Sequence, residues 1–456
     1  ERAQPNRRMA GEMKAAIRKT TSKISVTFPG PQLDTKDEFV RNTLEVRVPQ
    51  IIARTLEYNP RLGKECVNKI KGLAEEMKRD NPLRLLEDNS PDAEDWNNFL
   101  TPVVDKGFKW SNAPWLAWEC YVYRRLFEAT NFWETKSDYF AREKMTGLAN
   151  TRREILQRVK VGAKIAGTWS WQGFRRIVAL DLWGNQADGS LFDVETIKIK
   201  GGQGNSNKLL SDMSEKMWEI LNRPSRMQNG RHFRKVVFFN DNAGLEIASD
   251  LVLAHYLLTS GRVTHVELKL KPYPFFVSDA NPGDVLSTIK WLADMEEKPY
   301  AVKMAKELKK YVESKQLIIN TEFFLTSARP MWEMPQAMRE ELSMVDLVIV
   351  KGDLMYRKLV GDYKFPWNTS FEALLSYFPC PVASLRTCKS PVVVGIQKKL
   401  GLKLQKEDKG WLTTGKYAVI QVADPQAIRA VVVGDQGFDV VLNVTTNACD
   451  NMCSIQ

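Results

Sequence analysis

The stretch Val236-Val-Phe-Phe-Asn-Asp-Asn-Ala-Gly244 joins a short run of large apolar residues to a turn of small and polar ones. Such a run, bounded by turn residues, is typical of a strand that is buried on both faces of a sheet. The segment from Leu245 to Leu258 that follows has the length and the apolar content of a buried helix. The pattern therefore predicts a strand, a turn and a helix in immediate succession.

The same alternation continues toward the C-terminus. Further strands are predicted at Val263–Leu270, Asp346–Val350, Val392–Val394 and Ala418–Val422, and helical stretches separate several of them. Strands that alternate with helices form a mostly parallel sheet with helices on both faces. We therefore expect an α/β fold whose core is a three-layer α/β/α arrangement with a mostly parallel sheet.

The first third of the chain has a different texture and predicts helices only. Its apolar residues recur at helical spacing. Examples are Val48, Ile51, Ile52 and Leu56. A second helical block runs from Ala113 to Leu126. Three tryptophans of this region are interpreted as the seam between the helices and the core, with a lid as the alternative: Trp110, Trp115 and Trp118.

These textures divide the chain into four parts. They are a basic, disordered leader (1–40), an all-helical lobe (41–168), an α/β/α core that carries the candidate site (169–434) and a polar C-terminal tail (435–456). Gly201–Asn207 is interpreted as a flexible loop and not as a phosphate-binding loop, because no strand leads into it and no Gly-Lys-Ser/Thr ends it.

The net charge of +11, from 66 Lys and Arg against 55 Asp and Glu, allows a polyanionic partner. Part of the excess lies in the leader, which favours a solvated tail over a nucleic-acid-binding arm. No run approaches the ~18 apolar residues of a membrane span. The polar N-terminus is unlike a signal peptide. The six cysteines are not expected to form a disulfide framework. We expect a cytoplasmic protein, with the nucleus as the alternative, and neither membrane nor nucleic acid as a partner.

The histidine content limits the kind of metal site that the chain can build. The sequence holds three histidines, His232, His255 and His265, and the last two lie in apolar helical and strand-like runs that favour structural roles. A catalytic triad based on histidine or a zinc site with several histidines is therefore not expected. Any metal site should be built from oxygen ligands.

Polar side chains follow three of the predicted strands, where ligands of open α/β sheets bind. Asp241 and Asn242 follow the first strand, Asp279 comes after the second, and Asp353 comes after the third. Side-chain oxygens of Asp241, Asn242 and Asp279 with open positions suit Mg²⁺ or Mn²⁺, with Co²⁺ and Ni²⁺ as alternatives. The competing interpretation is a helix cap and turn at Asp241 and Asn242, where these residue types are common.

Cationic side chains surround the third of these strand ends. Lys351, Arg357 and Lys358 flank Asp353, and Arg386 and Lys389 precede the predicted strand Val392–Val394. Cations beside a metal-binding acidic cluster suit a phosphate, whose charge both can neutralise. The alternative is an ordinary network of surface ion pairs, which contributes little to stability.

At this point the sequence resembles the damage-control phosphatases, specifically the subfamily marked by an RTxK motif and including the acidic-residue methyltransferase group. The segments that carry the resemblance occur in the same order along most of the chain. They are Arg47–Gln50, Pro114–Arg125, Leu182–Asn185 with Asp188, Asp241–Gly244 with Glu246 and Asp250, Phe276–Asp279, Lys351–Leu359 with Gly361 and Asp362, Arg386–Lys389, and Thr413–Tyr417.

The resemblance implies metal-dependent hydrolysis of phosphomonoesters on an α/β/α core with a helical lobe. Sugar phosphates such as fructose 1-phosphate and fructose 6-phosphate are the implied substrates, and Mn²⁺, Co²⁺, Ni²⁺ or Mg²⁺ is the implied cofactor. Asp241, Asn242 and Asp279 are the implied metal ligands and catalytic residues. The nucleophile is open between a metal-bound water and a carboxylate such as Asp241.

The resemblance also implies a set of substrate contacts. They are the run Asp353, Leu354, Met355, Tyr356 and Arg357 together with the phosphate-binding Lys389, and Arg386 and Lys351 are expected to support the phosphate. The family pattern has Asn where this chain has Met355. A thioether cannot replace the hydrogen bonds of an amide, so Met355→Asn is predicted to raise activity on fructose phosphates or to broaden the substrate range. Glu119 and Tyr123, one helical turn apart, are further candidates for supporting the substrate.

Two other function classes remain as alternatives. The resemblance brings in an S-adenosylmethionine-dependent methyltransferase acting on protein glutamates, with Glu246 as the cofactor contact. It ranks second because the chain lacks the Gly-rich loop after a first strand that such a cofactor usually requires. A nucleic-acid-binding module ranks third and depends only on the net charge.

Overall fold

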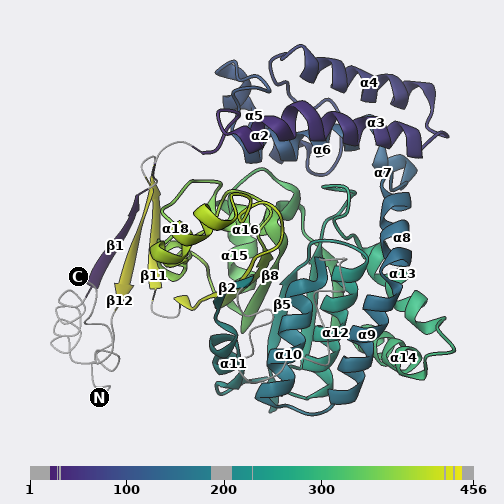
Figure 1. Cartoon of the computed structure of the whole chain (residues 1–456), viewed down its shortest axis with the longest axis vertical. Helices are drawn as coiled ribbons and strands as arrows, with labels where there is room; N and C mark the ends of the chain where they lie inside the picture. Colours follow the sequence, from purple (N-terminus) through teal and green to yellow (C-terminus); the bar gives the residue numbers. More distant parts are fainter. Residues whose placement is uncertain are drawn as a thin grey trace, which may run out of the picture.

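The computed structural model of the chain describes residues 21–27, 29, 32–185, 208–228, 230–425, 428–434 and 437–443. The predicted loop Gly201–Asn207 and Asp188 lie outside these residues. A lobe of helices lies above an α/β core, and a small sheet lies beside that core (Figure 1). The α/β class, the mostly parallel sheet and the N-terminal helical region are confirmed.

A seven-stranded sheet forms the centre of the core, in the order β2-β10-β9-β8-β5-β6-β7. Its strands are β2 (Leu209–Asp212), β5 (Lys235–Phe239), β6 (His265–Leu270), β7 (Leu317–Thr321), β8 (Leu347–Lys351), β9 (Val382–Thr387) and β10 (Ala418–Ala423). Strands β9, β8, β5, β6 and β7 are parallel to one another, whereas β10 runs antiparallel to β9 and carries β2 parallel to itself. The carboxyl ends of the five parallel strands therefore meet at one edge.

The predicted strand Val392–Val394 is wrong, because these residues form no strand. The backbone of Val392–Val394 makes hydrogen bonds with side chains from elsewhere in the chain and not with the backbone of a neighbouring strand. The Arg386 guanidinium donates to Val392 O, Val394 N donates to the Tyr356 hydroxyl at 3.1 Å, and the Gln421 amide donates to Val394 O at 2.7 Å. The strand of this region is β9, which ends just before Lys389.

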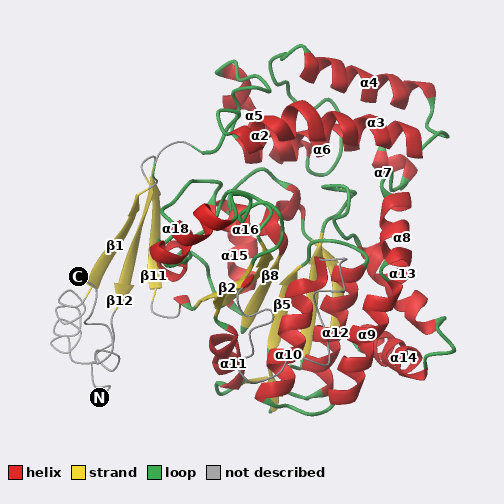
Figure 2. Ribbon diagram, in the orientation of Figure 1, coloured by secondary structure: helices red, strands yellow, loops and turns green. Residues whose placement is uncertain are grey.

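Helices cover both faces of the sheet (Figure 2). One face packs on α9 (Arg152–Ile165), α10 (Trp171–Leu182), α11 (Ser214–Asn222), α12 (Leu245–Thr259), α13 (Pro282–Ala293) and α14 (Pro299–Glu313). The other packs on α15 (Gln336–Ser343), α16 (Gly352–Val360), α17 (Phe371–Leu374) and α18 (Lys398–Glu407). Alternate residues of β5 point to opposite faces, as strand geometry requires: Val236 and Phe238 to one, Val237 and Phe239 to the other.

The helical lobe contains α2 (Glu38–Asn42), the π-helical turn η1 (Thr43–Arg47), α3 (Val48–Tyr58), α4 (Lys64–Lys78), α5 (Ala93–Asp105), α6 (Trp115–Thr130), α7 (Phe132–Thr135) and α8 (Ala141–Asn150). The side chains of α6 are almost all buried, and they join residues of the sheet in one apolar cluster. Trp110, Trp115 and Trp118 are buried members of that cluster, which confirms the seam and not the lid. Helix α9, inside the range predicted as lobe, packs against α12 and α14 of the core.

A second sheet joins the two ends of the chain. Strand β1 (Thr21–Thr27) pairs antiparallel with β12 (Gly437–Asn443), which pairs antiparallel with β11 (Ile428–Gly434). The prediction of a disordered leader is therefore wrong for Thr21–Thr27, and the polar tail contains β12. Strands β1 and β12 are hydrogen-bonded to each other although they lie near opposite ends of the sequence. A local sequence pattern does not reveal such a pairing. The boundaries of the four predicted parts otherwise stay a prediction.

None of the described helices combines the length and the apolar character that crossing a bilayer requires. The four cysteines in the described residues, Cys66, Cys120, Cys380 and Cys388, are free thiols.

Lys358 on α16 is a buried cation without a carboxylate partner among the described residues. Its ammonium donates to the carbonyl and to the hydroxyl oxygen of Ser327 and lies 4.9 Å from the ring centre of Phe324. Lys358 therefore points away from Asp353, contrary to the prediction that it flanks that carboxylate. Burial lowers the pKa of Lys358 to about 8.

This burial predicts a pH-dependent stability. The pKa of Lys358 in the folded protein is below the unfolded value of about 10.4, so the unfolded chain binds more protons between these values and the free energy of unfolding rises with pH. In Lys358→Met this contribution is lost. Urea unfolding from about pH 7 to about pH 10 should show the unmodified protein gaining on the order of 2–3 kcal/mol relative to the variant. Parallel profiles would contradict the expectation.

Candidate metal and phosphate site

The carboxyl ends of β5 and β6 bring the three predicted metal ligands together. Asn242 and Asp279 pair as an isolated antiparallel bridge. Beside this bridge, Ala280 N donates to Asp241 O at 2.7 Å and Ala243 N donates to Ser278 O at 2.7 Å. Backbone hydrogen bonds therefore hold the turn after β5 against the loop after β6.

The side chain of Asn242 is oriented by its neighbours. Its Nδ2 donates to Asp241 Oδ2 at 2.6 Å and to Glu246 Oε2 at 2.9 Å, and its Oδ1 accepts from the Ser278 hydroxyl. Because two carboxylates take the hydrogens of the amide, Oδ1 is the side of Asn242 that can serve as a ligand. Glu246 thus supports Asn242. Among the described residues, no contact of Glu246 favours its alternative role as the S-adenosylmethionine contact.

Lys271 lies between the two aspartates, and no role at the site was predicted for it. Its fully buried ammonium lies 2.9 Å from Asp279 Oδ2 and 3.7 Å from Asp241 Oδ1, and it donates to Asn240 O at 2.6 Å. The available signal was a lysine placed directly at the end of a predicted strand of the sheet, where a buried ammonium needs a partner.

Lys351 lies in the interior beneath these residues. Its ammonium is 2.9 Å from Asp181 Oδ2, 3.1 Å from Asp250 Oδ1 and 3.7 Å from Glu246 Oε1, and all four residues are buried. Lys351 was predicted to support the phosphate, but its ammonium forms ion pairs with these three carboxylates instead. Asp181 comes from α10, far away in the sequence, and no pattern pointed to it.

Carboxyl groups outnumber ammonium groups in this buried cluster. Its carboxylates outnumber its lysines, Lys271 and Lys351, by three, and each carboxylate residue is at most 5% exposed: Asp181, Asp241, Glu246, Asp250 and Asp279. Burial and the neighbouring charge of Asp279 raise the pKa of Asp241 well above its usual range, although Lys271 acts in the opposite direction. Burial likewise raises the pKa values of Asp250 and Asp279. Unbalanced buried charge is costly, so the cluster fits a bound cation.

A divalent metal requires oxygen donors that are free to bind it. Asp279 Oδ2 is buried and accepts no hydrogen bond of good geometry despite the nearby Lys271. Within the described ranges, no group of three or more His, Cys, Asp or Glu side chains is arranged to hold a metal ion. The predicted set has two carboxylates and the amide oxygen of Asn242, and hard cations accept both ligand types. The residues present therefore fit a metal that keeps open positions.

The N-terminus of α16 lies directly against Asp241. Gly352 has a φ of +79°, and a Cβ at this position would lie 1.9 Å from Asp241 Oδ2, so only glycine allows the approach. The following Asp353 is partly exposed and accepts hydrogen bonds from Arg386 Nε at 2.8 Å and from Lys389 N at 3.0 Å. Burial is the largest influence on the pKa of Asp353 and would raise it, but the Arg386 and Arg357 guanidinium groups and the hydrogen bond from Lys389 N together outweigh burial, so the pKa is lowered. Asp353 thus fixes the start of the loop that carries Lys389.

Lys389 is partly exposed at the end of β9. In the part of the chain that the structure describes, its ammonium makes no hydrogen bond or ion pair. Its charge nevertheless lowers the pKa of Asp241, so the two side chains lie close enough to interact. A Cβ at Gly415 would lie 3.5 Å from Lys389 Cε, which places the Thr413–Tyr417 segment alongside the lysine. Lys389 is therefore available to a ligand near Asp241.

The remaining predicted substrate contacts are buried in the fold. Arg357 Nη1 donates to Glu119 at 2.6 Å, and its Nε and Nη2 donate to Asp362 at 2.8 and 2.7 Å. Its guanidinium also lies 3.4 Å from the ring centre of Trp115. Arg357 and Glu119 therefore join α16 to the helical lobe and are not free to bind substrate, contrary to the prediction.

Leu354, Tyr356 and Arg386 have structural partners as well. Leu354 is a buried member of the apolar cluster, and the Tyr356 hydroxyl donates to Gln421 Oε1 at 2.9 Å. The buried Arg386 donates to Ser390 in addition to Asp353, so it supports a phosphate only by positioning the Lys389 loop.

Met355 is fully buried in the apolar cluster, which changes the prediction for Met355→Asn. An amide there would lack hydrogen-bond partners, so we expect a loss of about 1–3 kcal/mol in the free energy of unfolding and no gain in kcat/KM on fructose phosphates. Met355→Leu, which conserves volume, should stay near the unmodified protein. Urea unfolding and a sugar-phosphate panel check this, and a faster, equally stable Asn variant would contradict it.

The chain is similar to known proteins over most of its length. Residues 41–404 match the model of the damage-control phosphatase ARMT1-like domain. The damage-control phosphatase ARMT1 of Xenopus tropicalis is 31% identical over 433 residues, which cover 84% of this chain and 96% of that protein. The human protein of that name is 28% identical over 430 residues, or 85% and 96% of the two chains.

A solved structure, that of a DUF89 family protein from Pyrococcus horikoshii, covers 86% of this chain and 99% of its own, with 12% identity and a TM-score of 0.44. The family model spans most of this chain and every candidate residue of the site up to Lys389. The chain therefore belongs to the ARMT1-like damage-control phosphatase family.

Proposed function

We propose that the chain is a metal-dependent phosphatase that hydrolyses small sugar phosphates of the fructose 1-phosphate and fructose 6-phosphate class. The family supports phosphatase activity in metabolite damage control. The observation that carries the proposal is the excess of buried carboxylates around Asp241 and Asp279, beside Lys389, whose ammonium has no hydrogen bond or ion pair with any described residue. Such a site favours a divalent cation together with an anionic group.

Asp241, Asn242 and Asp279 would hold the metal, for which Mn²⁺, Co²⁺, Ni²⁺ and Mg²⁺ all suit the oxygen donors. When bound, such an ion neutralises charge on a phosphoryl oxygen and polarises the phosphorus centre. Lys389 binds a further phosphoryl oxygen, and Asp353 and Arg386 hold the loop that carries this lysine. Hydrolysis consumes one water, breaks the ester P–O bond and releases a sugar and inorganic phosphate.

A small phosphate ester is thus the proposed partner, and the cytoplasm, with the nucleus as alternative, is the proposed location. No described contact favours methyl transfer or nucleic-acid binding over this function.

Phosphate release tests the proposal directly. Purified protein is assayed on fructose 1-phosphate, fructose 6-phosphate and other sugar phosphates, first with chelator and then with each of the four metals in excess. We expect release that chelator abolishes and metal restores. A methyl-transfer assay with labelled S-adenosylmethionine runs in parallel. Release that is unaffected by chelator would refute the metal mechanism, and methyl transfer without phosphate release would favour the alternative.

A further inference from the structure

The loop between β6 and α13, residues 271–281, carries Asp279 and Ser278 into the site. Ser278 N donates to Phe276 O at 2.8 Å, and Val277 between them has a φ of +67°. This is a γ-turn with a positive φ at its central residue, which is rare and strained. The strain is greater because Val277 is β-branched and Phe276 also has a positive φ, of +46°. The loop therefore needs outside contacts to keep this conformation.

The helical lobe supplies hydrogen bonds to the first half of this loop. The hydroxyl of Tyr273 donates to Asp92 Oδ2 at 3.0 Å, just before α5. The hydroxyl of Tyr139, just before α8, donates to Pro274 O at 3.1 Å. Both tyrosines are at most 3% exposed, so the two bonds are shielded from water.

A third contact from the lobe reaches the strained turn itself. The ring of Tyr123 on α6 stacks on Phe276, with centroids 4.4 Å apart and planes inclined by 27°. Tyr123 also lies 5.6 Å, centroid to centroid, from Phe275. Successive residues of the loop are thus held by the lobe up to the residue before Val277.

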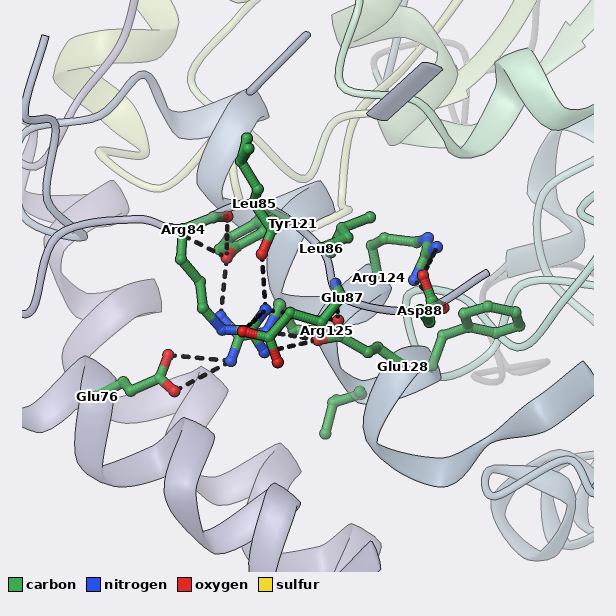
Figure 3. A network of polar contacts seen from close by, with 12 residues as sticks. Glu76, Arg84, Leu85, Leu86, Glu87, Asp88, Tyr121, Arg124, Arg125 and Glu128 are labelled. Carbon is green, nitrogen blue, oxygen red and sulfur yellow. Dashed lines mark hydrogen bonds and ion pairs between the residues drawn. The ribbon is translucent and has the colours of Figure 1, made fainter. Parts of the chain in front are cut away.

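The lobe side of these contacts is itself fixed. Arg124 of α6 is fully buried, and its guanidinium donates to Asp92 from Nε at 3.2 Å and to Asp88 from Nη1 and Nη2 at 3.0 and 2.8 Å. Figure 3 shows Arg124 and Asp88 facing each other, next to the network of Arg84, Arg125 and Glu128. Asp92 is therefore a rigid acceptor for Tyr273.

We infer that the helical lobe is a positioning element of the site, in which Asp92, Tyr123 and Tyr139 hold the strained loop that presents Asp279. The loop meets the rest of the site through the Ser278 hydroxyl on Asn242 and through the bridge between Asn242 and Asp279. If the lobe released the loop, the γ-turn would relax, and only the contacts with the β5 turn and Lys271 would hold Asp279 beside Asp241. The expected effect on metal binding rests on the proposed function, whereas the contacts between the lobe and the loop do not.

The double variant Tyr139→Phe/Tyr273→Phe tests the inference, since it removes both hydroxyl groups and keeps both rings. Tyr256→Phe is the matched control, because it removes a buried hydroxyl that donates to Ser170 O at 3.3 Å near the far end of α12. Amide hydrogen exchange of residues 275–280 and the Kd for Mn²⁺ by calorimetry are measured on the metal-free proteins.

In the double variant we expect exchange of these amides to be about tenfold faster and Mn²⁺ binding to be at least about threefold weaker, as the loss of two hydrogen bonds implies. The control should match the unmodified protein in both measurements. Unchanged exchange in the double variant would overturn the inference, as would faster exchange with unchanged Mn²⁺ affinity. If the unmodified protein binds none of Mn²⁺, Co²⁺, Ni²⁺ and Mg²⁺, the proposed function fails, and hydrogen exchange still decides whether the lobe holds the loop.

Discussion

Asp241→Asn is expected to lower kcat/KM for phosphate release by at least about a hundredfold, because even residues that only support metal ligands cost 10–100-fold when changed. Asp279→Asn should do the same. Neither change should make the metal-free protein less stable, because each removes one negative charge from a buried cluster in which carboxylates exceed lysines. Steady-state kinetics at saturating Mn²⁺ and thermal unfolding in chelator measure the two effects.

Asp294→Asn, at the end of α13, serves as the control. Its carboxylate is exposed and pairs with Lys290 one turn earlier, at 2.7 Å, and such surface pairs contribute little. It should leave both activity and stability unchanged. If Asp241→Asn retained kcat/KM within about threefold of the unmodified protein, Asp241 would not be a metal ligand.

Lys389→Ala has the second largest expected effect. Removing one charged hydrogen bond to the phosphoryl group costs roughly 1.5–3 kcal/mol, so kcat/KM should fall by about one to two decades. The Kd for Mn²⁺ should stay close to normal, since Lys389 is not a ligand. Lys389→Arg should rescue only part of the loss, because a forked guanidinium replaces a compact charge.

Lys416→Ala is the matched control for Lys389. Lys416 belongs to the neighbouring Thr413–Tyr417 segment, is exposed, and binds Asp408 at 3.2 Å. Its loss should not change the kinetics. Normal kinetics of Lys389→Ala on every phosphate ester tried would remove Lys389 from the site.

The strand and turn around Asp241 could be predicted because their signals are local. A run of large apolar residues ending in Asn, Asp and Gly specifies β5, its turn and the start of α12 without reference to distant residues. The Val392–Val394 stretch has a similar local signal but forms no strand. Its backbone is bound by the side chains of Arg386, Tyr356 and Gln421, and such partners from elsewhere in the chain are not visible in a run of valines.

The acidic residues of the site were predictable for a related reason. The carboxyl ends of parallel strands meet at one edge, so Asp241 and Asp279 had to lie close together. The cations were not predictable in the same way, because spacing along the chain does not reveal which way a lysine or arginine points. Lys351 turns inward to Asp181, and Arg357 turns to the lobe. The contribution of the lobe to the Asp279 loop depends on contacts between residues more than a hundred positions apart.

The central claim is that Asp241, Asn242 and Asp279 together hold one divalent cation. Anomalous diffraction from crystals of the protein grown with Mn²⁺ tests it most directly. The account predicts a single strong Mn²⁺ peak at the carboxyl ends of β5 and β6, within coordinating distance of both carboxylates and of Asn242 Oδ1. A protein that releases phosphate in the presence of Mn²⁺ but shows no peak there, or a peak bound by other residues, would contradict it.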